Sequence, residues 1–201
     1  GYECLDDGAE GYGCYADGAV RVMSGDEAIV KETKLDEGYC WGYLIRSSVI
    51  KAYAIRFPEG VMFMEDWAFI TQVMVHAQCF VVAPILYYLY RDNASSCVAN
   101  MTMGKLLSGC RSIDTVCRLA SETNGEVRVR LTENICFNIN IILWFVIHYS
   151  RFFAERKAIM HTLKSLLKMV DASLVPARLK VFNLVPNLYV MALHAATKRK
   201  Y

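Results

Sequence analysis

Two adjacent carboxylates, Glu65 and Asp66, interrupt an otherwise apolar and aromatic stretch, "MEDWAF", at residues 64–69. A carboxylate beside apolar side chains can act as a general base that takes a proton from a hydroxyl group. Acidic residues are also favoured in the first turn of a helix, where the backbone N–H groups stabilise negative charge. The two roles are compatible, because a helix start keeps Asp66 ionised while the aromatic neighbours exclude water.

The residues after Asp66 predict the helix that carries this pair. It should end near Gln78, because apolar side chains recur at helical spacing at Phe69, Ile70, Val73, Met74 and Ala77. Residues 55–60, "IRFPEG", predict an extended segment that ends in a turn. Residues 79–90 predict two extended pieces separated by Pro84.

The first 31 residues predict short strands and one short helix. Turn signals at "DDG" and "ADG" flank segments that can pair as strands, and the second of these includes residues 19–23. Ser24 and Glu27 have the spacing of a capping box, which predicts a helix start at this point.

Beyond residue 100, helical patterns occupy residues 102–121, 127–153, 155–171 and 178–198. We therefore expect an α/β part over residues 1–98 and a mostly α-helical bundle over residues 99–201. The balance of acidic and basic residues also changes between residues 98 and 99. The first part has 7 Lys or Arg against 14 Asp or Glu, and the second has 15 against 6. The two parts should therefore face different partners.

Cysteine usage and hydropathy favour a cytoplasmic protein. The eight cysteines form no C-x-x-C pair, so we expect reduced core thiols and no zinc site. The first ten residues are acidic and polar, unlike a signal peptide. The apolar run at 141–149 is too short for a membrane span, and Asn134 and Asn138 precede it, so it predicts a buried helix.

Four motifs in residues 41–96 occur in the order known from one enzyme family. They are Trp41 followed by "YLIRSSVI", then "IRFPEG", then the Glu65–Asp66 pair, and then "YLYRDNASS" at 88–96. This stretch resembles the acceptor-side half of family 2 glycosyltransferases, which have the GT-A fold. The resemblance implies a partial GT-A fold and an inverting transfer of sugar from a nucleotide sugar to an acceptor.

The resemblance also implies roles for individual residues. Asp66 would be the catalytic base and Glu65 its orienting partner. The diphosphate-binding loop would comprise Arg91, Ser95 and Ser96, whose guanidinium and hydroxyl groups suit leaving-group oxygens. The alternative for Arg91 is a solvated charge at a strand end.

Two tryptophans are candidates for binding sugar. Trp41 and Trp67 could stack on sugar faces, and packing in the core is the alternative for each of them.

The family's nucleotide-binding βαβ region and its metal-binding D-x-D motif have no clear counterpart here. Asp6 and Asp7 in "LDDGAEG" could ligate a divalent cation, although a plain turn is the alternative. The resemblance therefore implies a fragment without the nucleotide-binding half. We expect no cofactor in this fragment, and Mg²⁺ or Mn²⁺ in the full-length enzyme.

The helical part carries a basic stripe at Lys157, His161, Lys164 and Lys168. Such a stripe is either a solvated face over a core or an interfacial helix that binds anionic lipid. The basic residues are not interleaved with exposed aromatics in a motif that reads RNA or DNA, so we expect no nucleic-acid partner.

The leading hypothesis is a glycosyltransferase fragment that uses a nucleotide sugar and a saccharide or lipid-linked acceptor in cell-surface polysaccharide synthesis. It would be cytoplasmic or peripheral at the inner face of the membrane. The alternative is a non-catalytic membrane-surface or partner-binding module that keeps part of the fold.

Overall fold

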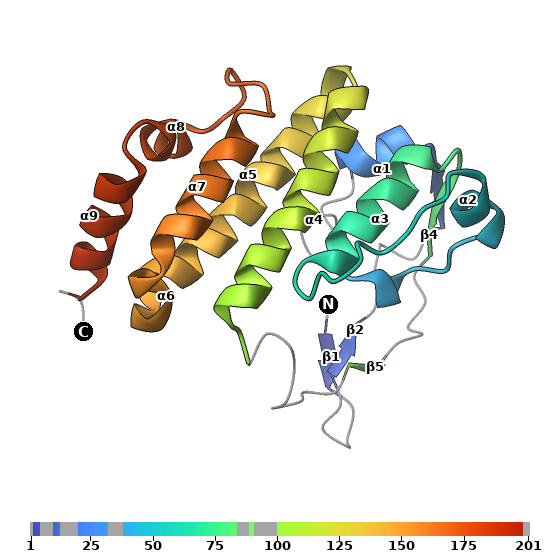
Figure 1. The fold of residues 1–201 in the computed structure, drawn as a ribbon. Helices are drawn as coiled ribbons and strands as arrows, with labels where there is room; N and C mark the ends of the chain where they lie inside the picture. The colour runs from blue at the N-terminus through green and yellow to red at the C-terminus, as the bar shows by residue number, and fades with distance from the viewer. Residues whose placement is uncertain are drawn as a thin grey trace.

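The computed structural model describes residues 2–4, 10–12, 20–31, 38–83, 89–90 and 100–198. These residues are mostly helical (Figure 1). The helical elements are α1 (Gly25–Lys31), the 3₁₀ turn η2 (Cys40–Gly42), α2 (Ser47–Ala52), α3 (Glu65–His76), α4 (Met103–Glu122), α5 (Gly125–His148), α6 (Ser150–Ala154), α7 (Arg156–Leu167), α8 (Ala177–Leu184) and α9 (Pro186–Lys198). The strands are β1 (Tyr2–Cys4), β2 (Glu10–Tyr12), β3 (Arg21–Met23), β4 (Phe80–Val82) and β5 (Leu89–Tyr90).

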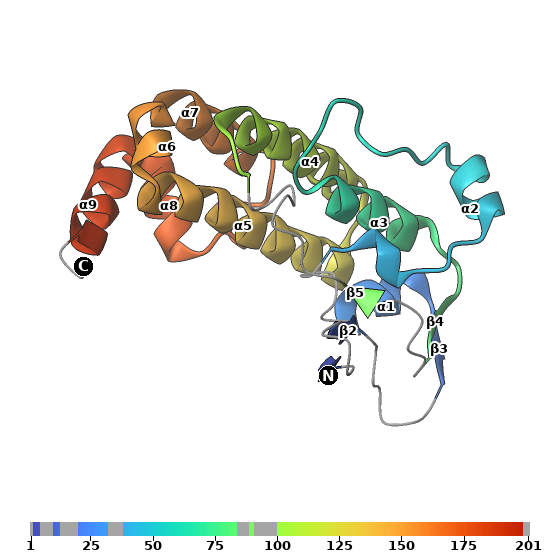
Figure 2. The same cartoon turned by 90° about the horizontal axis from the view of Figure 1, so that it is seen from below.

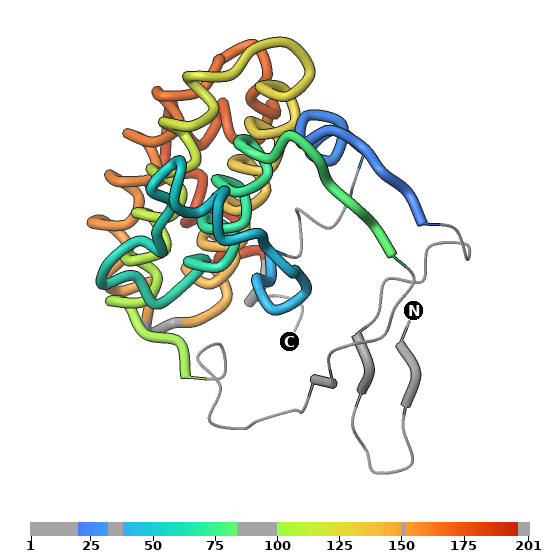
Figure 3. Tube along the Cα trace, turned by 90° about the vertical axis from the view of Figure 1, so that its right-hand side faces the viewer, coloured from blue at the N-terminus to red at the C-terminus, as the bar shows by residue number. Residues whose placement is uncertain are grey.

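The strands form two small antiparallel groups. One has the order β1-β2-β5, and the other pairs β3 with β4. Val22 lies opposite Val81 in the second pair, and Figure 3 shows both strands running side by side away from the helices. Residues 21–23 of the strand predicted at 19–23 form β3, which pairs with β4 and not with another described segment of residues 2–23. The helix-rich second part is confirmed, whereas a partial GT-A fold in the first part stays a prediction.

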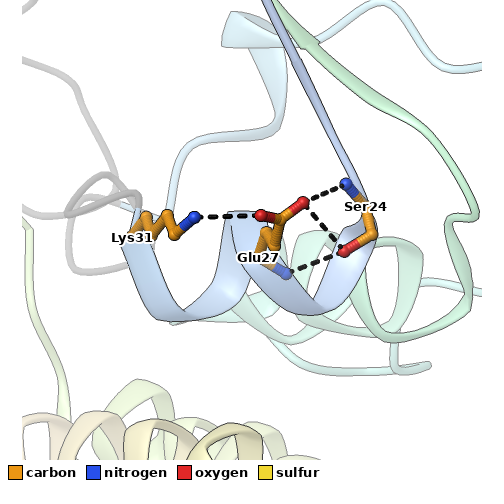
Figure 4. Close-up of polar contacts among 3 residues, drawn as sticks. All are labelled: Ser24, Glu27 and Lys31. Atoms are coloured by element: carbon orange, nitrogen blue, oxygen red, sulfur yellow. Dashed lines mark hydrogen bonds and ion pairs between the residues drawn. The ribbon is translucent and has the colours of Figure 1, made fainter.

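A capping box starts α1, as the sequence predicts. The Glu27 N–H donates to Ser24 Oγ at 3.1 Å, and the Ser24 N–H donates to the Glu27 carboxylate at 3.1 Å (Figure 4). Lys31 then pairs with the same carboxylate at 2.9 Å, one helical turn later. The bond from Lys31 and the backbone bond from Ser24 hold the pKa of Glu27 below its usual value.

Close backbone contact fixes α1 against the end of α3. The Gly25 N–H donates to the Ala77 carbonyl at 3.1 Å. A Cβ atom at position 25 would lie only 2.2 Å from that oxygen, so the contact requires glycine. The small β3–β4 pair and α1 are thereby tied to α3.

Helix α5 lies at the centre of the fold and contacts α1, α4, α6, α7 and α9. By length and hydropathy it could cross a membrane, but 67% of its apolar window is buried inside the protein. Asn134 and Asn138 are buried on it, and the Asn138 amide donates to the Asn134 carbonyl at 3.0 Å. The prediction of a buried helix is confirmed.

Two predicted helices are each interrupted. The pattern over 127–153 ends as α5 at His148, because Tyr149 has extended backbone angles, and α6 follows. The pattern over 178–198 divides into α8 and α9 at Val185, whose φ is −131°. Pro186 explains the second break, since proline disfavours helical angles in the preceding residue. Nothing in the local sequence marks the first break.

A single packed core crosses residue 99, where composition and charge change. Ile29 of α1 and Trp67 and Ile70 of α3 belong to the same buried cluster as Ile113 of α4 and Ile139 of α5. The acidic first part and the basic second part therefore share their interior.

We expect the side chains of Trp67 on α3 and Asn134 on α5 to contribute to stability in a coupled way. The Trp67 indole N–H donates to Asn134 Oδ1 at 3.0 Å, and Trp67 is 4% exposed. Trp67→Phe should lower the free energy of unfolding by at least about 1–3 kcal/mol, because it removes a buried donor. Asn134→Leu added to Trp67→Phe should cost less than the two single changes together, measured by urea unfolding. Additive effects would contradict the coupling.

Core cysteines should make stability fall in alkali. Burial raises the pKa of Cys110 and Cys117 to about 12 and that of Cys136 to about 11. Both states keep these thiols protonated below pH of about 8.5, the ordinary cysteine pKa. Above it the unfolded chain loses protons that the folded chain retains, so stability falls as pH rises toward 12.

Urea unfolding at a series of pH values measures this slope. A Cys110→Ala/Cys117→Ala/Cys136→Ala variant should show a flatter decline than the parent. Cys79→Ala is the control, since Cys79 is exposed. An equal decline in the parent and the triple variant would exclude the core thiols as its cause.

Candidate functional site

The Glu65–Asp66 pair occupies the first turn of α3, where the sequence places it. The helix starts at Glu65 and ends at His76, close to the predicted ends. Both carboxylates are half-buried. Among the described residues neither of them forms an ion pair; the salt bridges there are Lys31–Glu27, Arg118–Asp114 and Arg130–Glu133. The pair is thus not locked into the interior by salt links.

Helix α4 holds the loop that leads into the pair. The Met62 N–H donates to Ser108 Oγ at 3.1 Å, and the Ser112 hydroxyl donates to the Phe63 carbonyl at 3.2 Å. The Arg111 guanidinium donates to a loop carbonyl two residues before Met62. Three side chains on one face of α4 therefore position the start of α3.

The extended "IRFPEG" segment is held by α3 itself. Phe57 stacks on Phe69 with the ring centroids 4.0 Å apart and the planes almost parallel. The Gln72 amide donates to the Arg56 carbonyl at 3.2 Å. The segment ends in a turn at Glu59 and Gly60, as predicted.

The residue before the pair has left-handed backbone angles. Met64 has φ 61° and ψ 16°, and no side chain caps the helix at this position. Residues other than glycine adopt this conformation at a cost of about 1–2 kcal/mol. Its half-buried side chain packs against the core, which offsets the strain. The direction in which α3 starts is therefore set by tertiary contacts and not by a local cap.

A thiol lies beside Asp66. Burial, a hydrogen bond to Asp66 and the negative charges of Asp66 and Glu65 together raise the pKa of Cys40 to about 12. Cys40 is therefore a neutral thiol at physiological pH that donates to the carboxylate. A thiol with this pKa is a poor nucleophile, so the chemistry of the pair belongs to the carboxylates.

Two aromatic residues flank Cys40 in the chain. Tyr39 and Trp41 stack on each other with centroids 5.1 Å apart and an interplanar angle of 18°. Tyr39 is 45% exposed and Trp41 is half-buried. Because the η2 turn, which contains Cys40 and Trp41, packs against α3, the stacked pair lies near the helix that carries the carboxylate.

Trp67 lies in the core. It is 4% exposed, its indole bonds to Asn134, and Gly38 packs directly on its Cβ atom. Its rings offer no face to a ligand, so core packing, the alternative weighed for Trp67, describes its position. Of the two tryptophans predicted to stack on sugar, only Trp41 keeps part of its side chain exposed.

The diphosphate-loop residues Arg91, Ser95 and Ser96 lie outside the described residues, as do Asp6 and Asp7. Within the described part of the chain, no group of three His, Cys, Asp or Glu side chains could hold a metal ion. The residues present there thus supply no metal centre, and a divalent metal stays an expectation of the family resemblance.

Two hollows are formed by described residues of the helical part. One of about 310 Å³ lies between α4 and α7 and is lined by Leu107, Cys110, Arg111, Asp114, Thr162, Ser165, Leu166 and Met169. The other, of about 290 Å³, is lined by Ala120, Ser121, Arg128, Thr132, Met169, Val170 and Asp171. Asp66 lines neither of these two hollows.

Sequence reasoning missed the residues that position the pair. Cys40, Ser108 and Ser112 lie 26 or more positions from Asp66, and their contacts depend on how the helices pack. The sequence gives a weak indication of the Tyr39–Trp41 stack, since "YCW" has an aromatic residue on each side of Cys40. Nothing in the sequence indicates that Ser108 and Ser112 of α4 contact the loop before α3.

Comparison of the chain with protein-family models, with curated proteins and with solved structures finds no match.

Proposed function

We propose that this chain is the acceptor-binding part of an inverting glycosyltransferase, with Asp66 as the catalytic base. The observation that carries the proposal is the position of Asp66. It lies half-buried at the first turn of α3, with no ion pair to another described residue, and the η2 turn that contains Trp41 packs against this helix. The motif order between Trp41 and "YLYRDNASS" supports the same function.

The chemistry assigned to Asp66 is one proton transfer. Its carboxylate takes the proton of an acceptor hydroxyl as that oxygen attacks the anomeric carbon of a nucleotide sugar. The bond from that carbon to the diphosphate breaks on the opposite face, and the nucleoside diphosphate leaves with the electron pair. The neutral Cys40 thiol, whose pKa is raised first by burial and then by its hydrogen bond to Asp66, orients the carboxylate.

The aromatic pair supplies a surface for the acceptor. Sugar rings present C–H groups on one face, and these pack against aromatic rings. Tyr39 retains almost half of its surface for such contact. The proposed substrates are a nucleotide sugar and a saccharide or lipid-linked acceptor of cell-surface polysaccharide synthesis, at the cytoplasmic face of the membrane.

A second candidate is a non-catalytic module that binds a membrane or a partner. The observation in its favour is that neither hollow borders Asp66. The two functions differ in whether the carboxylate is needed, so one substitution separates them.

Asp66→Asn should lower the kcat of sugar transfer by about 10²–10⁴-fold, because it removes a general base and keeps the side-chain size. The assay uses the natural gene product that contains this chain. The matched control is Asp26→Asn, which makes the same change at the second residue of α1, also in the first turn of a helix. Circular dichroism checks that both variants fold. Full activity in Asp66→Asn would overturn the assignment and favour the non-catalytic module.

Calorimetric titration separates acceptor binding from donor binding. The 201-residue chain should bind UDP-, GDP- and CMP-sugars weakly or not at all, and it should bind the saccharide acceptor. Trp41→Ala should weaken acceptor binding about tenfold, which corresponds to the upper part of the range for an aromatic contact. Tight donor binding by this chain would contradict its assignment as the acceptor-binding part.

A further inference from the structure

Helix α9 lies at the opposite end of the molecule from α2 (Figure 2). One face of α9 packs inward: Val190 and His194 are buried, and the His194 ring stacks on Phe153 at 4.0 Å. This face contacts α5 and α7. It accounts for the attachment of α9 to the bundle.

The outward face of α9 is also apolar. Leu188 is 66% exposed, Met191 is 50% exposed, and Ala192 and Ala195 are exposed on the same face at helical spacing. The preceding α8 continues the apolar surface with Val181 and, at 77% exposure, Leu184. By contrast, α7 carries exposed Lys157 and His161, and exposed Lys168 follows its last residue. A helix that is apolar on both faces is normally covered on both.

The charges around this surface identify what covers it. Residues 172–201 contain five basic residues, Arg178, Lys180, Lys198, Arg199 and Lys200, and no Asp or Glu. Arg178 and Lys180 are exposed on α8, three and four residues before Val181 and Leu184. Asp171, before α8, is the nearest acidic side chain in the sequence, and it lies close enough to Lys180 for that charge to help lower its pKa, after the hydrogen bonds from Ser173 and the charge of Arg128. An apolar surface with a basic border matches the interface of an anionic bilayer.

We propose that the outward face of α8 and α9 docks on an anionic lipid surface, with Leu184, Leu188 and Met191 entering the acyl boundary and Arg178 and Lys180 at the headgroups. A second copy of the chain fits less well. Symmetric pairing of two such surfaces would bring their basic borders together, and like charges in an interface oppose association. This inference stands on α8 and α9 and does not depend on the transferase proposal.

The apolar part is tested by sedimentation with phosphatidylcholine vesicles that contain phosphatidylglycerol. Leu188→Glu/Met191→Glu should weaken vesicle binding at least about tenfold, because both side chains would leave the acyl boundary and add negative charge. The matched control is Leu44→Glu/Met62→Glu, which also changes one leucine and one methionine to glutamate. These two residues lie outside α8 and α9 and are 95% and 56% exposed. It should bind almost as the parent does.

The basic border is tested with variants of equal net charge. Arg178→Ser/Lys180→Ser should weaken binding about twenty-five-fold, since each basic residue near an anionic surface contributes about fivefold. Arg46→Ser/Lys51→Ser removes two exposed charges at α2 and should weaken binding far less. Binding by the parent should also fall as salt rises and be weak with pure phosphatidylcholine.

Three results would overturn the proposal. One is no binding of the parent to anionic vesicles. Another is equal loss of binding in each variant and its control. The third is that sedimentation velocity shows a dimer of the parent, that Leu188→Glu/Met191→Glu dissociates this dimer, and that the same variant binds vesicles as the parent does. A second copy of the chain would then cover α9. All substitutions lie at exposed positions, so circular dichroism should show the parent's helix content in each.

Discussion

The hydrogen bond between the Trp67 indole and the Asn134 side chain links α3, which packs on α1 and α4, to the central helix α5. A buried amide on the central helix requires a partner, and the indole supplies it from the other part of the chain. Because Trp67 must point inward, the residue before it is rotated by about 100° around the helix axis. That rotation leaves the Asp66 carboxylate half-buried beside Cys40. The position of the candidate base thus follows from the packing of its neighbour.

The two parts of the chain differ in charge but not in their interior. Ile29, Trp67 and Ile70 pack in the same cluster as residues of α4 and α5. Helix α4 adds hydroxyl and guanidinium contacts to the loop before α3. The helical part is therefore the support on which the acidic part builds its candidate site, and a site assigned to the first 98 residues depends on side chains beyond residue 100.

What the sequence predicts well here is local. The capping box of Ser24 and Glu27, the start of α3 and the buried character of α5 each depend on residues a few positions apart, and all three are confirmed. The break at Val185 could also have been predicted from Pro186. The contact of Cys40 with Asp66 and the serines of α4 could not, because they come from packing between helices that are far apart in the chain. The β3–β4 pair is of the same kind, since its strands are 56 or more residues apart and no turn joins them.

Met64 shows how two small energies are balanced at the start of α3. Its left-handed backbone costs about 1–2 kcal/mol, while burying a methionine side chain contributes about 1.5–3 kcal/mol when the burial is complete. Glycine would remove the first quantity and forfeit the second, so the two residues should be nearly equal in stability there. They would differ in stiffness: the thioether anchors the loop to the core, whereas glycine would leave the acidic turn free to pivot.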